Sequence, residues 1–391
     1  SSFNSEVGLV EGERDSLSGL FTNIEGAVIA DDNADSKKIN LPQQQINHSK
    51  AALVNTIFIG KCLLKLNAAY QFNQRREFED DNVLPSLQFD LATTTADARF
   101  YFPEYKGWES VVGLSTLYQE NKNKGEEFLI PAYKMNDAGG FLSVKKNYKK
   151  LTWNIGARFD VRKIEGESLK VDDEQKFYEF NNEFNAFSGS AGLTYELNSR
   201  WNFKINGGRG FRAPNISELS ANGIHEGTFR YELGNTSLKP ELSLQGDAAL
   251  NFHTAMISAD VSVFYNYIDN FIYYRNFNNQ SIYVEGEQFP VYRYIQGASN
   301  LRGLEFKFDI HPFDALHWEN SISYVEGRNE IINEPLPFIP PLHIRNEITW
   351  TIPVKKNFRE TYLTIGLDNY FKQDKIDQFE TNTNGYNLLF A

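Results

Sequence analysis

Tyrosine, arginine and histidine side chains gather in several polar stretches of this 391-residue chain, where they could recognise a ligand. A tyrosine presents an apolar ring with a hydroxyl group, and an arginine presents a planar cation with several hydrogen-bond donors. Both residue types are enriched at the centres of binding surfaces. The candidate ligand-binding residues are His225, Arg230, Tyr231, Tyr273, Tyr274 and Arg275. For each of them taken singly, the alternative is an ordinary loop residue with no role in binding.

Patterns for metal binding and catalysis are incomplete. The segment 31–36 places acidic or amide side chains at positions one, three and five of a calcium loop, but it lacks the glycine at six, and Pro42 stands at position twelve. It predicts an acidic solvated loop, with calcium binding as the alternative. The six histidines show no close metal-ligand spacing, and no Ser/His/Asp or nucleophilic cysteine signature is recognisable. The sequence therefore predicts no metal site, no cofactor and no enzyme.

Composition narrows the class of protein. The net charge of -12 argues against a nucleic-acid partner, whose phosphates require a basic surface. The single cysteine, Cys62, excludes an internal disulfide and a cysteine metal cluster. No apolar run reaches the roughly 18–20 residues that a transmembrane helix needs. A soluble β protein and a β-barrel remain, because a barrel strand needs apolar side chains only at alternate positions.

Alternation of apolar and polar residues predicts that β-strands position the candidate residues. Between 151 and 161 the odd positions are apolar, whereas the even positions include Arg158 and Asp160. A charge facing lipid costs about 2–4 kcal/mol at the bilayer midplane, so in a barrel both residues must face the lumen. About fifteen strands are predicted on this basis: 48–58, 61–75, 86–101, 107–119, 136–145, 150–162, 184–196, 200–211, 240–252, 255–275, 291–311, 315–327, 341–352, 357–371 and 385–391.

Short turns and long loops alternate between these strands. The long connections are 120–135, 163–183, 212–239, 276–290, 328–340 and 372–384. Outer-membrane barrels have short periplasmic turns and long extracellular loops. The sequence therefore predicts an all-β, antiparallel transmembrane barrel over 48–391, preceded by a long extracellular loop region over 1–47. A closed single-chain bacterial barrel has an even strand count, so we expect the chain to be a piece of a longer protein.

The five tryptophans all lie near predicted short turns. They are Trp108, Trp153, Trp201, Trp318 and Trp350. Tryptophan favours a membrane–water interface, because its ring is apolar and its N–H needs a partner. One level of tryptophan at the short-turn end predicts the periplasmic girdle of an outer-membrane barrel. Five core tryptophans in a soluble β protein are the alternative.

Two segments carry a family resemblance. Residues 208–219 read Gly-Arg-Gly-Phe-Arg-Ala-Pro-Asn-Ile-Ser-Glu-Leu, and residues 231–241 read Tyr-Glu-Leu-Gly-Asn-Thr-Ser-Leu-Lys-Pro-Glu. They resemble the Gly-Phe-Arg-Ala-Pro…Glu-Leu and Gly-Asn-Pro-x-Leu-Lys-Pro-Glu segments of TonB-dependent outer-membrane receptors, with Thr236 where proline is usual. The matching residues are Gly210, Phe211, Arg212, Pro214, Glu218, Gly234, Asn235, Leu238, Lys239, Pro240 and Glu241.

The resemblance implies a plugged barrel of twenty-two strands, of which this chain would hold roughly strands six to twenty. In the family, a globular plug with a TonB-contacting box precedes the barrel, and neither is recognisable here. The motif residues belong to the wall and the loop bases. We expect Arg212 to pair with Glu218, and Lys239 and Glu241 to cap the strand that follows them.

The implied function is energised import of a scarce nutrient across the outer membrane of a Gram-negative bacterium. Long loops and plug would capture the ligand, the TonB complex would open a path, and outer-membrane lipid would surround the wall. Ferric siderophores or ferric citrate are the commonest ligands of relatives, whereas haem, cobalamin, glycans and peptides stay open. A passive porin-like channel, which needs no plug, and a soluble β-rich binding protein are the alternatives.

Overall fold

The computed structural model describes residues 2–8, 12–14, 21–23, 28–29, 41–79, 84–225, 228–276, 279–284, 286–352, 361–378 and 380–391. The acidic segment 31–36 and the short interval 353–356 between two predicted strands lie outside these ranges. In the described part of the chain, no helix is both long enough and apolar enough to cross a membrane.

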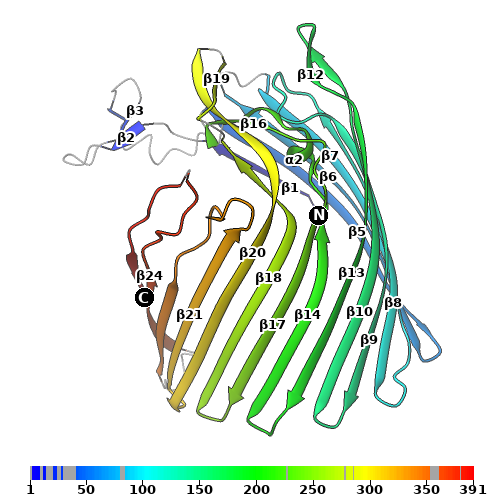
Figure 1. Cartoon of the computed structure of the whole chain (residues 1–391), viewed down its shortest axis with the longest axis vertical. Coiled ribbons are helices and arrows are strands. Elements are labelled where there is room, and N and C mark those ends of the chain that lie inside the picture. The colour runs from blue at the N-terminus through cyan, green and yellow to red at the C-terminus, as the bar shows by residue number, and fades with distance from the viewer. Residues whose placement is uncertain are drawn as a thin grey trace.

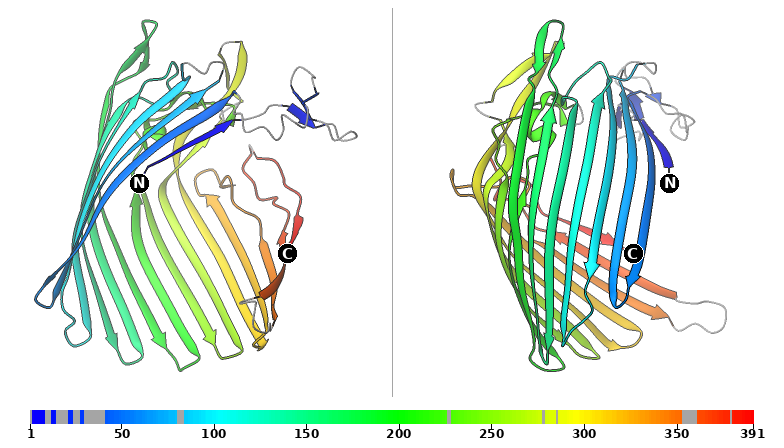
Figure 2. Two further views of the ribbon diagram at one scale, coloured as in Figure 1. Left: turned by 180° about the vertical axis from the view of Figure 1, so that it is seen from behind. Right: turned by 90° about the vertical axis from the view of Figure 1, so that its right-hand side faces the viewer.

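Long strands make up nearly all of the fold (Figure 1). They are β5 (Gln43–Ile59), β6 (Cys62–Phe78), β7 (Leu87–Tyr101), β8 (Trp108–Asn123), β9 (Tyr133–Tyr148), β10 (Leu151–Gly166), β13 (Phe180–Glu196), β14 (Trp201–Arg212), β17 (Glu241–His253), β18 (Ile257–Arg275), β20 (Glu287–Phe313), β21 (Leu316–Asn329), β23 (His343–Ile352), β24 (Thr361–Tyr370) and β25 (Tyr386–Phe390). Each one pairs antiparallel with the next in this order. The result is one curved barrel wall (Figure 2), which confirms the predicted all-β antiparallel architecture.

The predicted strands all have a counterpart, but the structure extends several of them at the long-loop end. For example, β9 begins at Tyr133 and β20 at Glu287, where the alternation predicts starts at 136 and 291. Pairing between main chains continues there, and at the start of β9 the apolar residues Tyr133 and Met135 belong to the core inside the wall rather than to its outer face. Periodicity therefore predicts the part of each strand that needs an apolar face, and it underestimates the length of the hydrogen-bonded ladder.

Several long connections contain short elements of their own. They are β11 (Leu169–Val171), β12 (Glu174–Phe177), α2 (Ile216–Ser220), β15 (Asn222–His225), β16 (Arg230–Leu233), β19 (Ser281–Val284) and β22 (Glu334–Pro335). The range 1–47, expected to be a loop, contains β1 (Ser2–Gly8), β2 (Gly12–Arg14), β3 (Phe21–Asn23) and β4 (Val28–Ile29). β1 pairs antiparallel with the first residues of β5 and so extends the wall by one strand.

The two faces of the wall differ in polarity. On β10, Ile155 and Phe159 are each 52% exposed on the outer face. Arg158 and Asp160 lie on the opposite face, where the arginine Nε donates to Asp160 Oδ2 over 2.7 Å. Both line a lumenal hollow of about 480 Å³, so the prediction that they face the lumen is confirmed.

A small hydrophobic core lies inside the wall at the long-loop end. Its buried residues are Tyr133, Ile164, Phe184, Ala213, Leu219, Leu238 and Ile272. They come from wall strands, from α2 and from the segment that returns to β17. The connection between β14 and β17 is thus folded against the wall by apolar contacts, and this connection carries both family motifs.

Candidate ligand-binding site at the long-loop end

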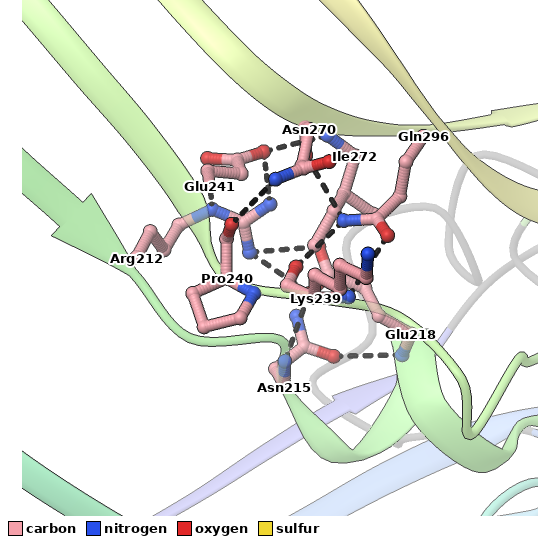
Figure 3. Close-up of polar contacts among 9 residues, drawn as sticks. All are labelled: Arg212, Asn215, Glu218, Lys239, Pro240, Glu241, Asn270, Ile272 and Gln296. Atoms are coloured by element: carbon pink, nitrogen blue, oxygen red, sulfur yellow. Dashed lines mark hydrogen bonds and ion pairs between the residues drawn. The ribbon is translucent and has the colours of Figure 1, made fainter. Parts of the chain in front are cut away.

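Arg212, at the end of β14, joins α2 and β17 through two carboxylates (Figure 3). Its Nη1 donates to both oxygens of Glu218, each over 2.8 Å. Its Nε and Nη2 donate to Glu241 over 2.7 and 2.6 Å. Both carboxylates are mostly buried, and a single cation that bonds to both offsets the cost of enclosing their charge. The expected pairing of Arg212 with Glu218 is confirmed.

The same carboxylates also bind main-chain groups. Glu218 and Asn215 form a capping box at the start of α2: the Asn215 N–H donates to Glu218 Oε2 over 2.8 Å, and the Glu218 N–H donates to Asn215 Oδ1 over 2.9 Å. Glu241 accepts from the main-chain N–H of Ile272 over 2.7 Å. These bonds occupy donors that the short helix and the strand end would otherwise leave unsatisfied.

Main-chain contacts fix the returning segment before β17. A Cβ added to Gly234 would lie 2.3 Å from the Ser220 nitrogen, so the close approach of these two backbones requires glycine. Gln296 on β20 accepts from the Lys239 N–H over 2.8 Å and donates to the Lys239 carbonyl over 2.6 Å. Lys239 is therefore held through its main chain.

The other motif residues surround this junction. Phe211 packs against the hydrophobic core, and Pro214 and Leu238 are buried. The Pro240 carbonyl accepts from Asn270 Nδ2 over 3.3 Å. Gly210 pairs with Ser243 across β14 and β17, and Asn235 donates its main-chain N–H to the Glu218 carbonyl over 2.8 Å. We call the set of Arg212, Glu218 and Glu241 the Arg212 junction.

Arg230 on β16 is the centre of a second group, which we call the Arg230 cluster: His225, Arg230, Glu232, Tyr274, Tyr292 and Tyr294. The Arg230 guanidinium lies 4.0 Å from the centroid of the Tyr274 ring and 5.6 Å from that of Tyr292. These distances are within the range of cation–π attraction. The Arg230 Nε also donates to Glu232 Oε1 over 2.7 Å. The cluster joins β16 to β18 and β20.

Glu232 is the buried anion of the Arg230 cluster, with a side chain that is 3% exposed. It accepts from Tyr294 Oη over 3.0 Å, and its Oε1 lies 2.9 Å from His225 Nδ1. Burial acts to raise the pKa of the Glu232 carboxyl, but hydrogen bonds from His225 and Arg230 and the charge of Arg230 outweigh it. The pKa of Glu232 therefore lies below its ordinary value.

The structure divides the six candidate ligand-binding residues. Tyr274 belongs to the Arg230 cluster, whereas its neighbours on β18 point the other way, as alternation requires. Tyr273 Oη accepts from Asn329 Nδ2 over 2.8 Å, and Arg275 binds Glu334 over 2.6 Å. Tyr273 and Arg275 are both buried. They hold the connection after β21 rather than sharing a site with Arg230.

Tyr231 contacts a further set of residues. Its hydroxyl donates to Asn222 Oδ1 on β15 over 2.8 Å, and Lys176 Nζ lies 5.8 Å from the centroid of its ring. Burial lowers the pKa of the Lys176 ammonium group. Tyr231 thus ties the β15–β16 hairpin to β12.

Several aromatic side chains at the long-loop end are exposed to solvent. Tyr178, Tyr283 and Phe338 are 77%, 70% and 67% exposed. By contrast, the side chain of Arg230 is 15% exposed and that of Arg275 is 9% exposed, and both bind carboxylates of the same chain. Both arginines thus already bind groups of the same chain, and their role in ligand binding stays a prediction, whereas the exposed aromatic rings present apolar surface and, on the two tyrosines, a hydroxyl group.

The five tryptophans lie at the short-turn end of the wall. Trp108 and Trp201 begin β8 and β14, Trp153 and Trp318 lie close to the starts of β10 and β21, and Trp350 lies close to the end of β23. Trp108 packs edge to face on Trp153 with ring centroids 5.0 Å apart. Trp318 packs on Phe308 at 5.3 Å. A role for this belt at the membrane interface stays a prediction.

Comparison with known proteins agrees with this fold. The family described as TonB dependent receptor-like, beta-barrel, matches residues 28–389. Among solved structures, the copper transporter OprC shares 15% identity and a TM-score of 0.70, over 89% of this chain and 56% of its own. The FrpB iron transporter from Neisseria meningitidis shares 12% identity and a TM-score of 0.66, over 99% of this chain and 60% of its own.

A third similar structure is the ferric yersiniabactin uptake receptor FyuA from Yersinia pestis. It shares 11% identity and a TM-score of 0.62, over 89% of this chain and 53% of its own. The chain thus spans between 53% and 60% of the length of these three proteins. At these identities the likeness is one of fold. Because the family match extends over most of the sequence, the chain belongs to the TonB-dependent receptor family, in the part that forms the β-barrel.

Proposed function

We propose that the protein is an outer-membrane receptor that imports a scarce nutrient with energy delivered by the TonB complex. The observation that carries the proposal is the set of exposed aromatic side chains at the long-loop end of a barrel of this family, one of which, Phe338, packs on Tyr274 of the Arg230 cluster. Members of the family are transporters of Gram-negative outer membranes, not enzymes. We accordingly propose an outer-membrane location with lipid around the wall, and contact with TonB through a plug of the kind that the family carries.

A ferric siderophore or a ferric citrate complex is the proposed ligand class. Two of the similar structures bear names that refer to iron, as an iron transporter and as a ferric yersiniabactin uptake receptor. Tyrosine and phenylalanine rings can stack on the flat organic part of a chelate, and the tyrosine hydroxyl groups can donate hydrogen bonds to its oxygens. The copper transporter among the neighbours makes a free metal ion the competing ligand class.

The test is uptake of radioactive iron by cells that carry the full-length protein as their sole receptor. We expect uptake from one or more ferric siderophores or ferric citrate, and loss of that uptake when TonB is deleted. Replacement of Tyr178 and Tyr283 by alanine should weaken ligand binding roughly tenfold or more, as the loss of two contact aromatics would. Tyr148→Ala is the matched control, since this tyrosine is 57% exposed at the opposite end of the wall.

Two results would contradict the proposal. Uptake that persists without TonB would indicate a passive channel. Equal binding by the Tyr178/Tyr283 double variant and by the unaltered protein would exclude the aromatic tips as the contact surface.

A further inference from the structure

A third polar group lies at the opposite end of the wall, beside the turn between β20 and β21. Asp309, His311 and His317 each offer one metal-ligand atom, and these atoms lie within 4.8 Å of one another. His311 Nε2 is 2.8 Å from Asp309 Oδ2, and the rings of His311 and His317 meet edge to face with centroids 4.1 Å apart. The two histidines adjoin the paired residues Ile310 and Trp318, so the hairpin itself brings them together.

The three side chains face the lumen. Phe308 and Trp318 contact each other on the apolar face, and the residues next to them in the strands must point the other way. His311 and His317 line a hollow of about 280 Å³, to which His253 on β17 and Asp314 also contribute. An ion in solution could therefore reach both imidazoles from the short-turn mouth of the barrel.

The group does not satisfy its own bonding capacity. Asp309 Oδ1 is enclosed by protein and makes no hydrogen bond to any residue in the described part of the chain. Native proteins normally provide such an oxygen with a donor, a water molecule or an ion. An enclosed carboxylate oxygen next to two imidazoles is the arrangement that a cation would complete.

The donor set matches the chemistry of zinc. Two imidazole nitrogens and one carboxylate oxygen, with water in the fourth position, form a known type of tetrahedral zinc site. Bonds of about 2.0–2.1 Å would bring the ligand atoms to roughly 3.5 Å from one another. Side-chain rotation can supply this adjustment, which widens the 2.8 Å contact between His311 and Asp309 and draws in the atoms that lie farther apart, because the His311 side chain is 30% exposed and lies at the edge of a hollow.

We propose that Asp309, His311 and His317 bind a divalent transition-metal ion of the zinc type at the short-turn end of the lumen. The ion would link the end of β20 to the start of β21 across their turn. This site is separate from the long-loop end and does not depend on the identity of the imported ligand.

The experiment uses the full-length protein, purified in detergent without a histidine tag and stripped with a chelator. Zinc binding is measured by competition with a chromogenic chelator. We expect binding in the micromolar range or tighter, and a loss of affinity of roughly a hundredfold or more in the His311→Gln, His317→Gln double variant, because two of three protein donors are gone. Cobalt in place of zinc should give the visible absorption of a tetrahedral site in the unaltered protein but not in the double variant.

His343→Gln is the matched control. His343 also lies 2.9 Å from a carboxylate, that of Asp368, but its ring stacks on Tyr370 rather than on a second histidine. This variant should keep the zinc affinity, and heat-modifiable migration on gels should show that all variants are folded barrels. The proposal fails if the double variant binds zinc as tightly as the unaltered protein, or if His343→Gln loses as much affinity.

Discussion

At the residue scale, Arg212 and Arg230 have similar structural roles at the long-loop end of the barrel. Each cation faces a carboxylate that is largely enclosed by protein, and each joins segments that are distant in the sequence. A carboxylate that is left enclosed without its cation costs free energy. Replacing the arginine alone should therefore lower the stability of the protein more than replacing the arginine together with its carboxylates. This asymmetry makes the role of each arginine testable.

Arg212→Ala is expected to destabilise the long-loop end. Two mostly buried carboxylates would then share one site without a cation. We expect a loss of about 1–3 kcal/mol, less than for a fully buried pair, because the Arg212 side chain is 43% exposed and partly screened by solvent. Thermal unfolding in detergent measures the change. Glu218→Gln with Glu241→Gln in the Arg212→Ala background should restore part of the stability.

Arg209→Ala is the control for this effect. Arg209 lies on the same strand and donates to the main-chain carbonyl of Phe187. Its replacement should leave the melting temperature nearly unchanged. A shift as large as that of Arg212→Ala would show that the carboxylates are not the cause.

The lowered pKa of Glu232 predicts how the stability of the Arg230 cluster responds to acid. Its pKa in the folded protein lies below the ordinary value of 4.5. The stabilisation is therefore fully present above about pH 4.5 and is lost as the pH falls through the lower, folded-state pKa. Hydrogen-exchange protection of β15 and β16, corrected for intrinsic rates, should fall in that acidic range. Glu232→Gln should remove this pH dependence, and its persistence in the variant would assign it to another group.

Residue types alone could predict part of the site. The motif predicted the Arg212–Glu218 pair, and loop composition selected Arg230 and Tyr274. Glu232 and Tyr294 were missed, although Glu232 lies two residues from Arg230 on the same face of a short strand. The division between Tyr273 and Tyr274 depends on which loops cover each face of β18, and no local pattern encodes that.

The histidines illustrate the same limit. Searching for helical or short-loop spacing finds no metal site, because His311 and His317 are adjacent across a hairpin and Asp309 follows the alternation of one strand. The position of the turn sets the register of the hairpin, and this register places the two histidines next to each other.

At the element scale, the wall was predictable and the connections were not. A wall strand must place apolar residues at every second position, so periodicity reveals it. α2 spans five residues and β15 and β16 four each. Segments this short are held by the capping box, the Arg212 junction and the parallel pairing of β16 with β20. These are contacts between residues far apart in the sequence.

Gly234→Ala tests whether close backbone contact holds the connection between β14 and β17. The added methyl group would collide with the main chain of Ser220 and Ala221, so the returning segment must move away from α2. We expect a local loss of about 1–3 kcal/mol. It should appear as faster hydrogen exchange in 216–220, with the wall strands unchanged.

Gly246→Ala is the matched control for that experiment. The nearest atom to its added methyl group, outside its chain neighbours, is the Asn206 carbonyl oxygen at 4.0 Å, which is ordinary contact. Exchange in α2 should stay as in the unaltered protein. Equal effects of the two substitutions would show that glycine flexibility, rather than backbone contact, matters.

At the scale of the whole molecule, the two ends of the wall carry different chemistry. The long-loop end has carboxylate–arginine joints, a hydrophobic core and aromatic tips. The short-turn end has the tryptophan belt outside and the histidine group inside. This polarity agrees with a barrel whose long loops capture a ligand while its short turns face the compartment that receives it.

The depth of the tryptophans in a bilayer tests this orientation. In lipid vesicles that contain brominated lipids, the belt residues should be quenched most by bromine near the headgroup end of the acyl chain, since the interface satisfies both the ring and its N–H. The signal of the belt is isolated by comparing the protein with a variant in which Trp108, Trp201 and Trp318 are phenylalanine. Leu142→Trp in that variant is the deep reference, because Leu142 is 47% exposed in the middle of β9. It should be quenched most by bromine near the chain end. Identical depth profiles for the belt and for residue 142 would mean that the tryptophans do not mark a membrane interface. The outward face of the wall would then be in contact with something other than lipid.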